Sequence, residues 1–131
     1  MNQYDTILAL LGWIESNLTK RLTIERVSDK SGYTKFHLQR MFKSVTGRSI
    51  CAYIRGRQLS MAAMELRMTK RPIIDIAAAW HFDSQQSFTR AFKKQFGYTP
   101  ARYRKSDDWE LEGMEIPLYL VSVDVAACIS K

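Results

Sequence analysis

Two stretches of the chain carry glutamine and arginine side chains at the spacing of one face of a helix. In the first, positions i, i+3, i+4 and i+7 are Phe36, Gln39, Arg40 and Lys43. In the second they are Gln86, Thr89, Arg90 and Lys93, directly after Gln85. Arginine can pair bidentately with guanine and glutamine with adenine, while an aromatic ring or a threonine methyl contacts thymine. Both stretches therefore suit base-pair edges in DNA, and their lysines, further along, suit phosphates.

A single polar helix face of this kind is more often solvent-exposed surface than a binding surface. Here the face occurs twice, with an arginine in the same register each time. The opposite face is apolar in both stretches, which predicts that it packs on a core. The predicted core positions are Leu38, Met41, Phe42 and Val45 in the first stretch, and Phe88, Ala91, Phe92 and Phe96 in the second. The repetition favours a binding role for both polar faces.

The residues ahead of the two faces also repeat. Ile24 and Val27 precede Gly32-Tyr33, and Ile73 and Ile76 precede His81-Phe82 at an offset of 49. One extra residue in the second turn then makes the offset 50, which pairs Arg40 with Arg90. Each unit is predicted to be a short helix, a tight turn and a longer helix, over about residues 23–47 and 73–97. Two such copies indicate a duplicated helix-turn-helix.

Capping residues set the remaining boundaries. Apolar spacing predicts a first helix at 4–17, and Thr23, Thr34 and Ser49 can each cap the start of a further helix. Gly47 and Gly97 are suitable helix stops, and Thr99-Pro100 is a strong helix start. The helix that begins after Ser49 is the longest, at about residues 49–68. We predict an all-α fold of about seven helices with no strand before residue 115, in which this long helix joins the two units.

The charge is distributed unevenly along the 131 residues. Residues 1–105 hold 19 Lys and Arg against 7 Asp and Glu, a net charge of +12, whereas residues 106–131 hold one Lys against six acidic residues, a net charge of −5. A body with that positive charge favours a polyanionic partner, nucleic acid before an anionic membrane surface. No apolar run approaches the roughly 20 residues that span a bilayer, and no export signal is expected.

Several motifs together resemble the AraC/XylS family of bacterial transcription regulators, in particular its MarA/SoxS/Rob branch. These motifs are the segments 32–43, 53–55, 82–93 and 99–104, which occur in order between residues 4 and 105. The resemblance implies a DNA-binding domain of seven helices over 1–105. It also implies binding as a monomer to an asymmetric site on double-stranded DNA, and activation through contact with RNA polymerase. A rigid connecting helix would hold the recognition helices about one DNA turn apart, roughly 34 Å.

The resemblance also implies which residues contact DNA. The base-contacting positions carried over are Phe36, Gln39, Arg40, Gln85, Gln86 and Arg90, with Ser87 and Thr89 as secondary candidates. The candidates for phosphate contacts are Lys35, His37, Lys43, Arg55 and Lys93. Two positions depart from the family pattern. Relatives often have Trp where Phe36 stands, so the thymine contact here is expected to be smaller. They often have Gly at the position of His81, so we expect a strained turn, a less rigid unit or another turn geometry.

Residues 106–131 match no part of the DNA-binding motifs. The segment is acidic at first, and Leu118–Ala127 then alternates loosely between apolar and polar residues, which favours a strand. We expect a short C-terminal extension that packs on the body or stays mobile. At this length we expect no small-molecule effector domain in it.

Three other functions compete with this interpretation. An enzyme is disfavoured, because no nucleophile–base pattern, metal-ligand spacing or glycine-rich phosphate loop is present, and we expect no catalytic residue, metal or cofactor. A sequence-neutral architectural DNA-binding protein would share the charge but would not need matched Gln and Arg positions. A pure protein-interaction module is weakly disfavoured by Arg40 and Arg90. Cys51 and Cys128 are expected to stay reduced in the cytoplasm, where the bacterial nucleoid lies, and Cys51 is expected to be packed or inert.

Overall fold

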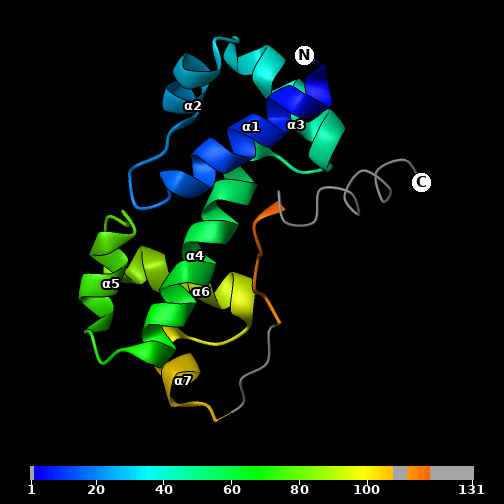
Figure 1. Cartoon of the computed structure of the whole chain (residues 1–131). Coiled ribbons are helices and arrows are strands. Elements are labelled where there is room, and N and C mark those ends of the chain that lie inside the picture. Colours follow the sequence, from blue (N-terminus) through cyan, green and yellow to red (C-terminus); the bar gives the residue numbers. More distant parts are fainter. Residues whose placement is uncertain (1, 108–111, 119–131) are drawn as a thin grey trace. The chain divides into compact units, whose positions relative to one another are not determined.

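The computed structural model describes residues 2–107 and 112–118, and seven helices make up most of this part of the chain (Figure 1). Their bounds are α1 Gln3–Ser16, α2 Ile24–Ser31, α3 Lys35–Thr46, α4 Ile50–Met68, α5 Ile73–Ala79, α6 Gln85–Phe96 and α7 Pro100–Lys105. No strand occurs among the described residues. The all-α prediction is confirmed. The strand expected at Leu118–Ala127 lies outside the described residues, except for Leu118 itself.

The chain forms two compact units. The N-terminal unit comprises Met1–Leu18, Leu22–Arg55 and Ile116–Lys131, and the C-terminal unit comprises Thr19–Arg21 and Gly56–Glu115. Helix α4 belongs to both units. Its residues 50–55 are part of the N-terminal unit, and its residues 56–68 are part of the C-terminal unit. The division expected from the sequence, a DNA-binding body of residues 1–105 followed by an extension, stays a prediction.

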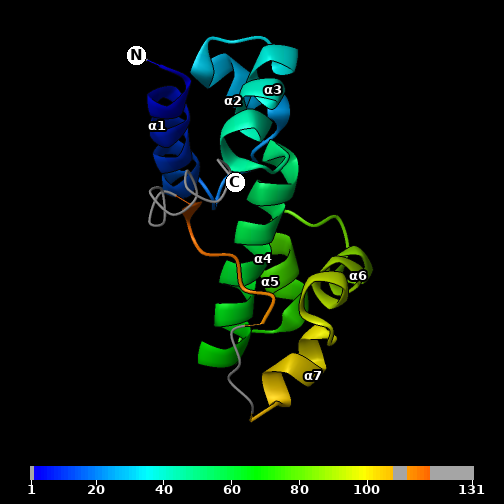
Figure 2. The ribbon, with the colours of Figure 1, turned by 90° about the vertical axis from the view of Figure 1, so that its right-hand side faces the viewer.

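In the N-terminal unit, α1 and α2 both pack against α3 (Figure 2). Asn2 caps α1, because its side-chain oxygen accepts a hydrogen bond from the backbone N–H of Asp5 at 2.8 Å. The apolar side of α1 contributes the fully buried Ile7 and Ile14 to the core. Burying such a side chain stabilises the fold by about 1.5–3 kcal/mol. This core is the platform that supports α3.

In the C-terminal unit, aromatic side chains tie α6 to α7. The rings of Phe92 and Phe96 are stacked with centroids 4.5 Å apart, and the Tyr103 ring meets Phe92 edge-on at 5.2 Å. The Arg67 guanidinium of α4 lies 3.9 Å above the centre of the Tyr103 ring. Burial raises the pKa of the Tyr103 hydroxyl, and the charge of Arg67 opposes this rise. The cluster packs the buried face of α6 against α7, and Arg67 of α4 packs on Tyr103.

Candidate nucleic-acid interface

The first helix-turn-helix, α2 to α3, is held by short-range capping. The Thr23 hydroxyl accepts from the backbone N–H of Arg26 at 3.2 Å, and the Thr34 hydroxyl accepts from the N–H of His37 at 3.2 Å. Gly32 ends α2 with a φ of 79°, in the left-handed region that glycine adopts at little cost. The two caps expected from the sequence are therefore confirmed. Thr23 sets where α2 begins, and Thr34 sets where α3 begins.

Helix α3 has one buried face and one exposed face. Leu38, Met41 and Phe42 are buried as predicted. On the other side Phe36 is 78% exposed, and Gln39, Arg40 and Lys43 are exposed too. An open depression of about 450 Å³ is lined by Gln39, Arg40, Lys43, Ser44 and Ser49. The candidate base-contacting residues of the first unit therefore share one accessible surface. We call this surface, and the matching surface of the second unit, the reading surfaces.

One core prediction in α3 holds only in part. Val45 is only half-buried, whereas its neighbour Thr46 is buried and donates a hydrogen bond from its hydroxyl to the Phe42 carbonyl at 2.8 Å. The inward side of the helix thus shifts by one residue near its end. Threonine can take this place because the backbone carbonyl satisfies its hydroxyl.

The predicted phosphate contacts of the first unit lie on its surface. Lys35 pairs with Glu25 through its Nζ at 3.3 Å from Oε1. The pKa of the Glu25 carboxyl is lowered, first by a hydrogen bond to its own backbone N–H and then by Lys35. His37 is exposed, with its ring edge-on to Tyr33 at 4.9 Å, and Arg55 is exposed on α4. A phosphate would have to compete with Glu25 for Lys35.

The second helix-turn-helix, α5 to α6, turns at a histidine. His81 has a φ of 66°, close to that of Gly32, and it is the one positive-φ residue other than glycine in the described chain. Its ring Nε2 lies 2.6 Å from the Thr19 carbonyl oxygen, which accepts a hydrogen bond from the Nε2–H group. The positive φ expected to strain this turn is thus confirmed. The hydrogen bonds at the two turns differ, since Gly32 donates to the Ser28 carbonyl four residues back and His81 to the Ala78 carbonyl three residues back. The lower rigidity expected of the second unit stays a prediction. The ring contact compensates part of a backbone strain of about 1–2 kcal/mol.

Helix α6 repeats the two faces of α3. Phe88, Phe92 and Phe96 are buried, while Gln85, Gln86, Arg90 and Lys93 are exposed; Ala91, expected in the core, is only half-buried. An open depression of about 630 Å³ is lined by Gln85, Gln86, Thr89 and Arg90. The structure therefore brings four of the five predicted reading residues of the second unit into one hollow.

Ser87, the fifth of these residues, has a different local role. It is half-buried, and its hydroxyl donates to the Ser84 carbonyl at 3.1 Å. Ser84 caps α6, since its own hydroxyl accepts from the Ser87 N–H at 3.1 Å. The Ser87 side chain is thus engaged in the cap at the start of the helix.

Sequence reasoning overlooked two polar residues beside the first reading face. Ser44 and Ser49 line the same depression as Arg40. Ser44 lies four residues after Arg40, so helical spacing alone would have placed it on that face. Ser49 could not be found in this way, because it follows the glycine that ends α3. Cys51, expected to be packed or inert, is exposed.

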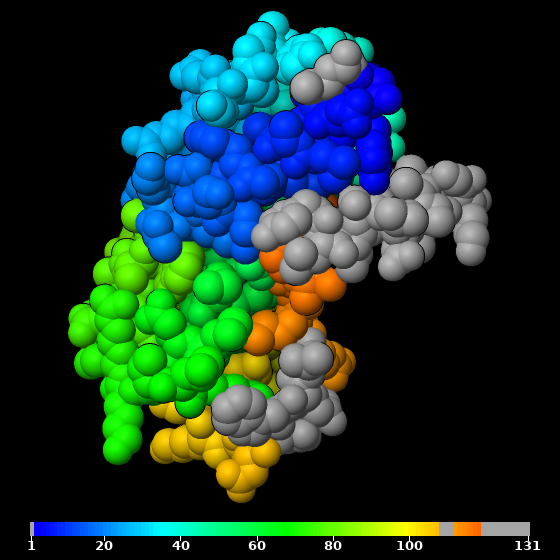
Figure 3. All heavy atoms as spheres, viewed as in Figure 1, coloured from blue at the N-terminus to red at the C-terminus, as the bar shows by residue number. Residues whose placement is uncertain are grey.

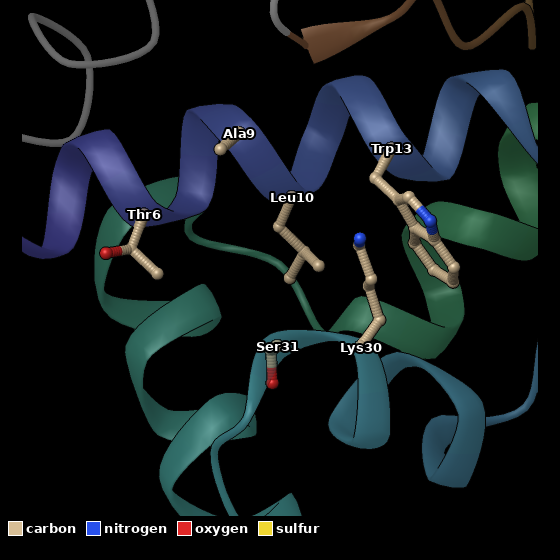
Figure 4. A pocket seen from close by; sticks show the side chains of 6 residues that line it. All are labelled: Thr6, Ala9, Leu10, Trp13, Lys30 and Ser31. Atoms are coloured by element: carbon tan, nitrogen blue, oxygen red, sulfur yellow. The ribbon is translucent and has the colours of Figure 1, made fainter.

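A smaller hollow lies between α1 and α2 (Figure 4). Thr6, Ala9, Leu10 and Trp13 line it from α1, and Lys30 and Ser31 from α2. In Figure 4 the Lys30 side chain extends toward α1 between Leu10 and Trp13. The volume of the hollow, about 180 Å³, is below the roughly 300–1,000 Å³ of typical small-molecule sites. The hollow therefore differs in size and lining from the two reading surfaces.

Residues 2–107 and 112–118 hold neither a metal-ligand cluster nor a membrane-spanning helix. In this part of the chain no three His, Cys, Asp or Glu side chains come together in a way that would hold a metal ion. No helix there combines the length and the apolar character needed to cross a membrane. The two reading surfaces thus remain the main candidates.

Comparison with known proteins decides the family. Residues 27–106 match the profile of a helix-turn-helix domain family. Over 120 residues the chain is 56% identical to the transcriptional regulator Rob of Salmonella typhimurium, covering 92% of this chain and 42% of that protein. The chain belongs to the AraC/XylS family of DNA-binding transcription regulators. It lies in the MarA/SoxS/Rob branch, and this family comprises regulators rather than enzymes.

Two further relatives support this placement. The multiple antibiotic resistance protein MarA of Escherichia coli is 46% identical over 102 residues, which cover 78% of this chain and 80% of MarA. The C-terminal domain of AraT, a response regulator from Geobacillus stearothermophilus, has the same fold at a TM-score of 0.71 and 28% identity, covering 80% of this chain and 93% of that domain. The chain spans less than half the length of the Rob relatives that it matches.

Proposed function

We propose that this AraC-type regulator binds as a monomer to an asymmetric DNA site and activates transcription. Helix α3 would enter one major groove and α6 the next, each with its exposed face toward the bases. The observation that carries the proposal is the pair of matched surfaces, each built on a recognition helix that presents glutamine and arginine in an open depression. A protein that only bends DNA would not need this match.

Each surface offers hydrogen-bonding groups suited to base edges. Arg40 and Arg90 can donate two parallel hydrogen bonds to guanine, and the neighbouring glutamines can both donate to and accept from adenine. Phe36, 78% exposed on α3, can contact a thymine methyl group. Its exposure leaves the ring accessible for such a contact. Thr89 lines the second depression and can contact a thymine methyl or a base edge there.

The surrounding cations would bind the DNA backbone. Lys35, His37, Lys43, Arg55 and Lys93 all lie on the surface of the described chain. Each phosphate that such a side chain neutralises releases bound counterions, so binding weakens steeply as salt rises. These contacts would fix the position of the protein on the duplex, while the two reading faces select the sequence.

The regulatory part of the proposal rests on the family. We propose that the DNA-bound protein contacts RNA polymerase and that it acts on the bacterial nucleoid in the cytoplasm. MarA and Rob carry regulatory names, and the sequence of this chain matches them over most of its length. An in vitro transcription reaction that contains only polymerase, template and this protein tests the activating role. Unchanged or reduced transcript from a bound template would contradict it.

The DNA-binding part is tested by selection from a random duplex pool with the purified chain at about 0.15 M salt. The selected duplex and a shuffled duplex of the same composition are then compared by equilibrium binding. We expect the selected duplex to bind about 10³–10⁷-fold more tightly, as specific regulators do. A ratio near one, with tight binding to both duplexes, would favour the architectural alternative. No binding to either would leave a protein-interaction role.

A further inference from the structure

A short segment after α7 is bound to the C-terminal unit by its backbone. We call residues 112–115 the strap; it lies against α4 on the molecular surface (Figure 3). The Glu115 backbone N–H donates to the Ser60 hydroxyl at 2.8 Å, and the Arg57 guanidinium donates to the Glu115 carbonyl at 2.5 Å. The side-chain amide of Gln95 donates to the Gly113 carbonyl at 2.7 Å. Main-chain groups of the strap are thus satisfied by α4 and α6.

The steric fit of the strap depends on two glycines. A Cβ atom added to Gly56 of α4 would come within 2.8 Å of Glu115 Cγ. One added to Gly113 would lie 2.7 Å from the Gln95 carbonyl oxygen and 2.8 Å from a ring carbon of Phe96. Real Cβ atoms do not approach that closely, so each glycine leaves room for its neighbour. The strap therefore fits closely against α4 and α6 at these two positions.

Gln95 is the residue at which α4, α6 and the strap meet. Besides the Gly113 carbonyl, its Nε2 lies 3.2 Å from the Gly56 carbonyl and 3.3 Å from the Ser60 hydroxyl. Gln95 is half-buried and follows Phe88 by seven residues, which is an apolar core position in the helical pattern. A polar side chain at such a position is costly unless it is hydrogen-bonded. Here the strap and α4 supply the hydrogen-bond acceptors for its side-chain amide.

The corresponding residue of the first unit has no such role. Val45 precedes Gln95 by the repeat offset of 50, and it is a half-buried apolar residue on α3. The polar anchor is therefore a feature of the second unit alone. It lies near the C-terminal end of α6, whereas Gln85, Gln86 and Arg90 lie in the first half of that helix.

We infer that Gln95, with the strap, is a positioning residue that sets the orientation of α6 for base reading. The inference rests on the proposed function. The Ser84 cap fixes the start of α6, and the Gln95 contacts fix the rotation of its end against α4 and the strap. Bidentate pairing between Arg90 and a guanine depends on direction as well as distance. A helix that turns by a small angle would keep its charge near the DNA but lose the base-specific geometry.

The test measures base discrimination in each half of the selected site for the full chain and its variants. Gln95→Val introduces the residue that the first unit carries in register, and Ser60→Ala removes the hydroxyl beneath Gln95 and the strap. Lys94→Ala is the matched control, because Lys94 is an exposed neighbour on the same helix. Mismatches are placed one at a time in the half that Arg90→Ala affects and in the half that Arg40→Ala affects. Each mismatch normally weakens binding by about 5- to 150-fold.

For Gln95→Val we expect mismatches in the α6 half to weaken binding by no more than about twofold, with full discrimination in the α3 half. Ser60→Ala should show the same pattern to a smaller degree, and Lys94→Ala should keep discrimination in both halves. Full discrimination in the α6 half by a folded Gln95→Val protein would overturn the inference. Equal loss in both halves would also overturn it, because that outcome indicates general destabilisation.

Two provisions keep the result interpretable. If Gln95→Val does not fold, Ser60→Ala decides by the same two criteria, since alanine is readily accepted inside a helix. If the wild-type chain itself selects no two-part site, the proposed function fails first. A wild type that reads both halves, together with a Gln95→Val protein that does so equally well, refutes only the positioning role.

Discussion

The two helix-turn-helix units share a pattern but are stabilised in different ways. In the first, both helices start at threonine caps and the turn is made by Gly32 at a φ of 79°. In the second, α5 begins after Pro72 without a side-chain cap, and the turn is made by His81 at a φ of 66° with its ring against Thr19. The first unit is therefore encoded largely by neighbours in sequence, and the second depends on residues far away.

The two units also differ in the core side chains that pack against α3 and α6. Phe42 of α3 has one aromatic neighbour, Tyr53, with ring centroids 5.9 Å apart, among the contacts found in the described chain. Phe92 of α6 touches Phe88, Phe96 and Tyr103, with centroids between 4.5 and 5.7 Å. The strap and Gln95 add polar contacts to α6. A duplicated motif can thus keep its surface chemistry while its support diverges.

The largest expected effect comes from the aromatic cluster. Phe92→Ala should destabilise the C-terminal unit by about 3–5 kcal/mol, because it leaves a cavity among three aromatic neighbours. Phe42→Ala is the matched change in the N-terminal unit and should cost a similar amount there. Residue-resolved amide exchange in urea measures each unit separately. If Phe92→Ala lowered protection of α3 as much as of α6, the supports of the two units would not be independent.

Next in size are the two arginines of the reading surfaces. Arg40→Ala and Arg90→Ala should each weaken binding to the selected duplex by about 1–3 kcal/mol, because each loses a pair of hydrogen bonds to a base. Lys43→Ala should instead weaken binding to all sequences alike and reduce the slope of log affinity against log salt by about one. Titrations at several salt concentrations separate the two behaviours. If Arg90→Ala weakened binding to all duplexes equally, the second unit would contact only the DNA backbone and would not select bases.

A smaller effect distinguishes the two turns. Gly32→Ala should cost about 1–2 kcal/mol, because an L-residue is strained at a φ of 79° although no atom lies within 4 Å of the added Cβ. At the other turn, His81→Gly and His81→Ala both lose the contact with Thr19. Their difference therefore isolates the backbone strain, and we expect the glycine variant to be more stable by about 1 kcal/mol. Urea unfolding measures both pairs, and equal stability of the two His81 variants would refute strain at this turn.

The smallest effect is an acid-range pH dependence that Glu25 gives to the first unit. The pKa of Glu25 lies below its ordinary value of 4.5 because of its own backbone N–H and Lys35, and the position 49 residues later is Ile74. A lowered carboxyl pKa stabilises the fold above the unfolded pKa, and this contribution is lost as pH falls through the folded pKa. Below about pH 4.5, wild type should thus lose slightly more stability in α2–α3 than Glu25→Gln does. Identical acid profiles in amide exchange would contradict this.

Local chemistry explains what could be predicted from the sequence. The caps at Thr23, Thr34 and Ser49 and the stop at Gly47 each involve residues at most four apart, so a short stretch of sequence is enough to reveal them. The two-faced character of α3 and α6 follows from helical periodicity in the same way. Both depend on neighbours along the chain.

Features that need distant partners could not be predicted. Gln95 was passed over because a polar residue in an apolar register has a meaning only once Ser60 and Gly113 are beside it. The ring contact of His81 with Thr19 joins residues 62 apart. Helical spacing alone predicted Val45 in the core. The burial of Thr46 could not be predicted, because it depends on the hydrogen bond from its hydroxyl to the Phe42 carbonyl.

The central claim is that one chain reads two DNA segments with two separate surfaces. The most direct test selects duplexes from a random pool in parallel with the wild type, Arg40→Ala and Arg90→Ala, and weighs each complex to count chains per duplex. We predict one chain on a two-part asymmetric site, with Arg40→Ala flattening the base preferences of one part and Arg90→Ala those of the other. Two chains per site, or one substitution that flattens both parts, would contradict the account.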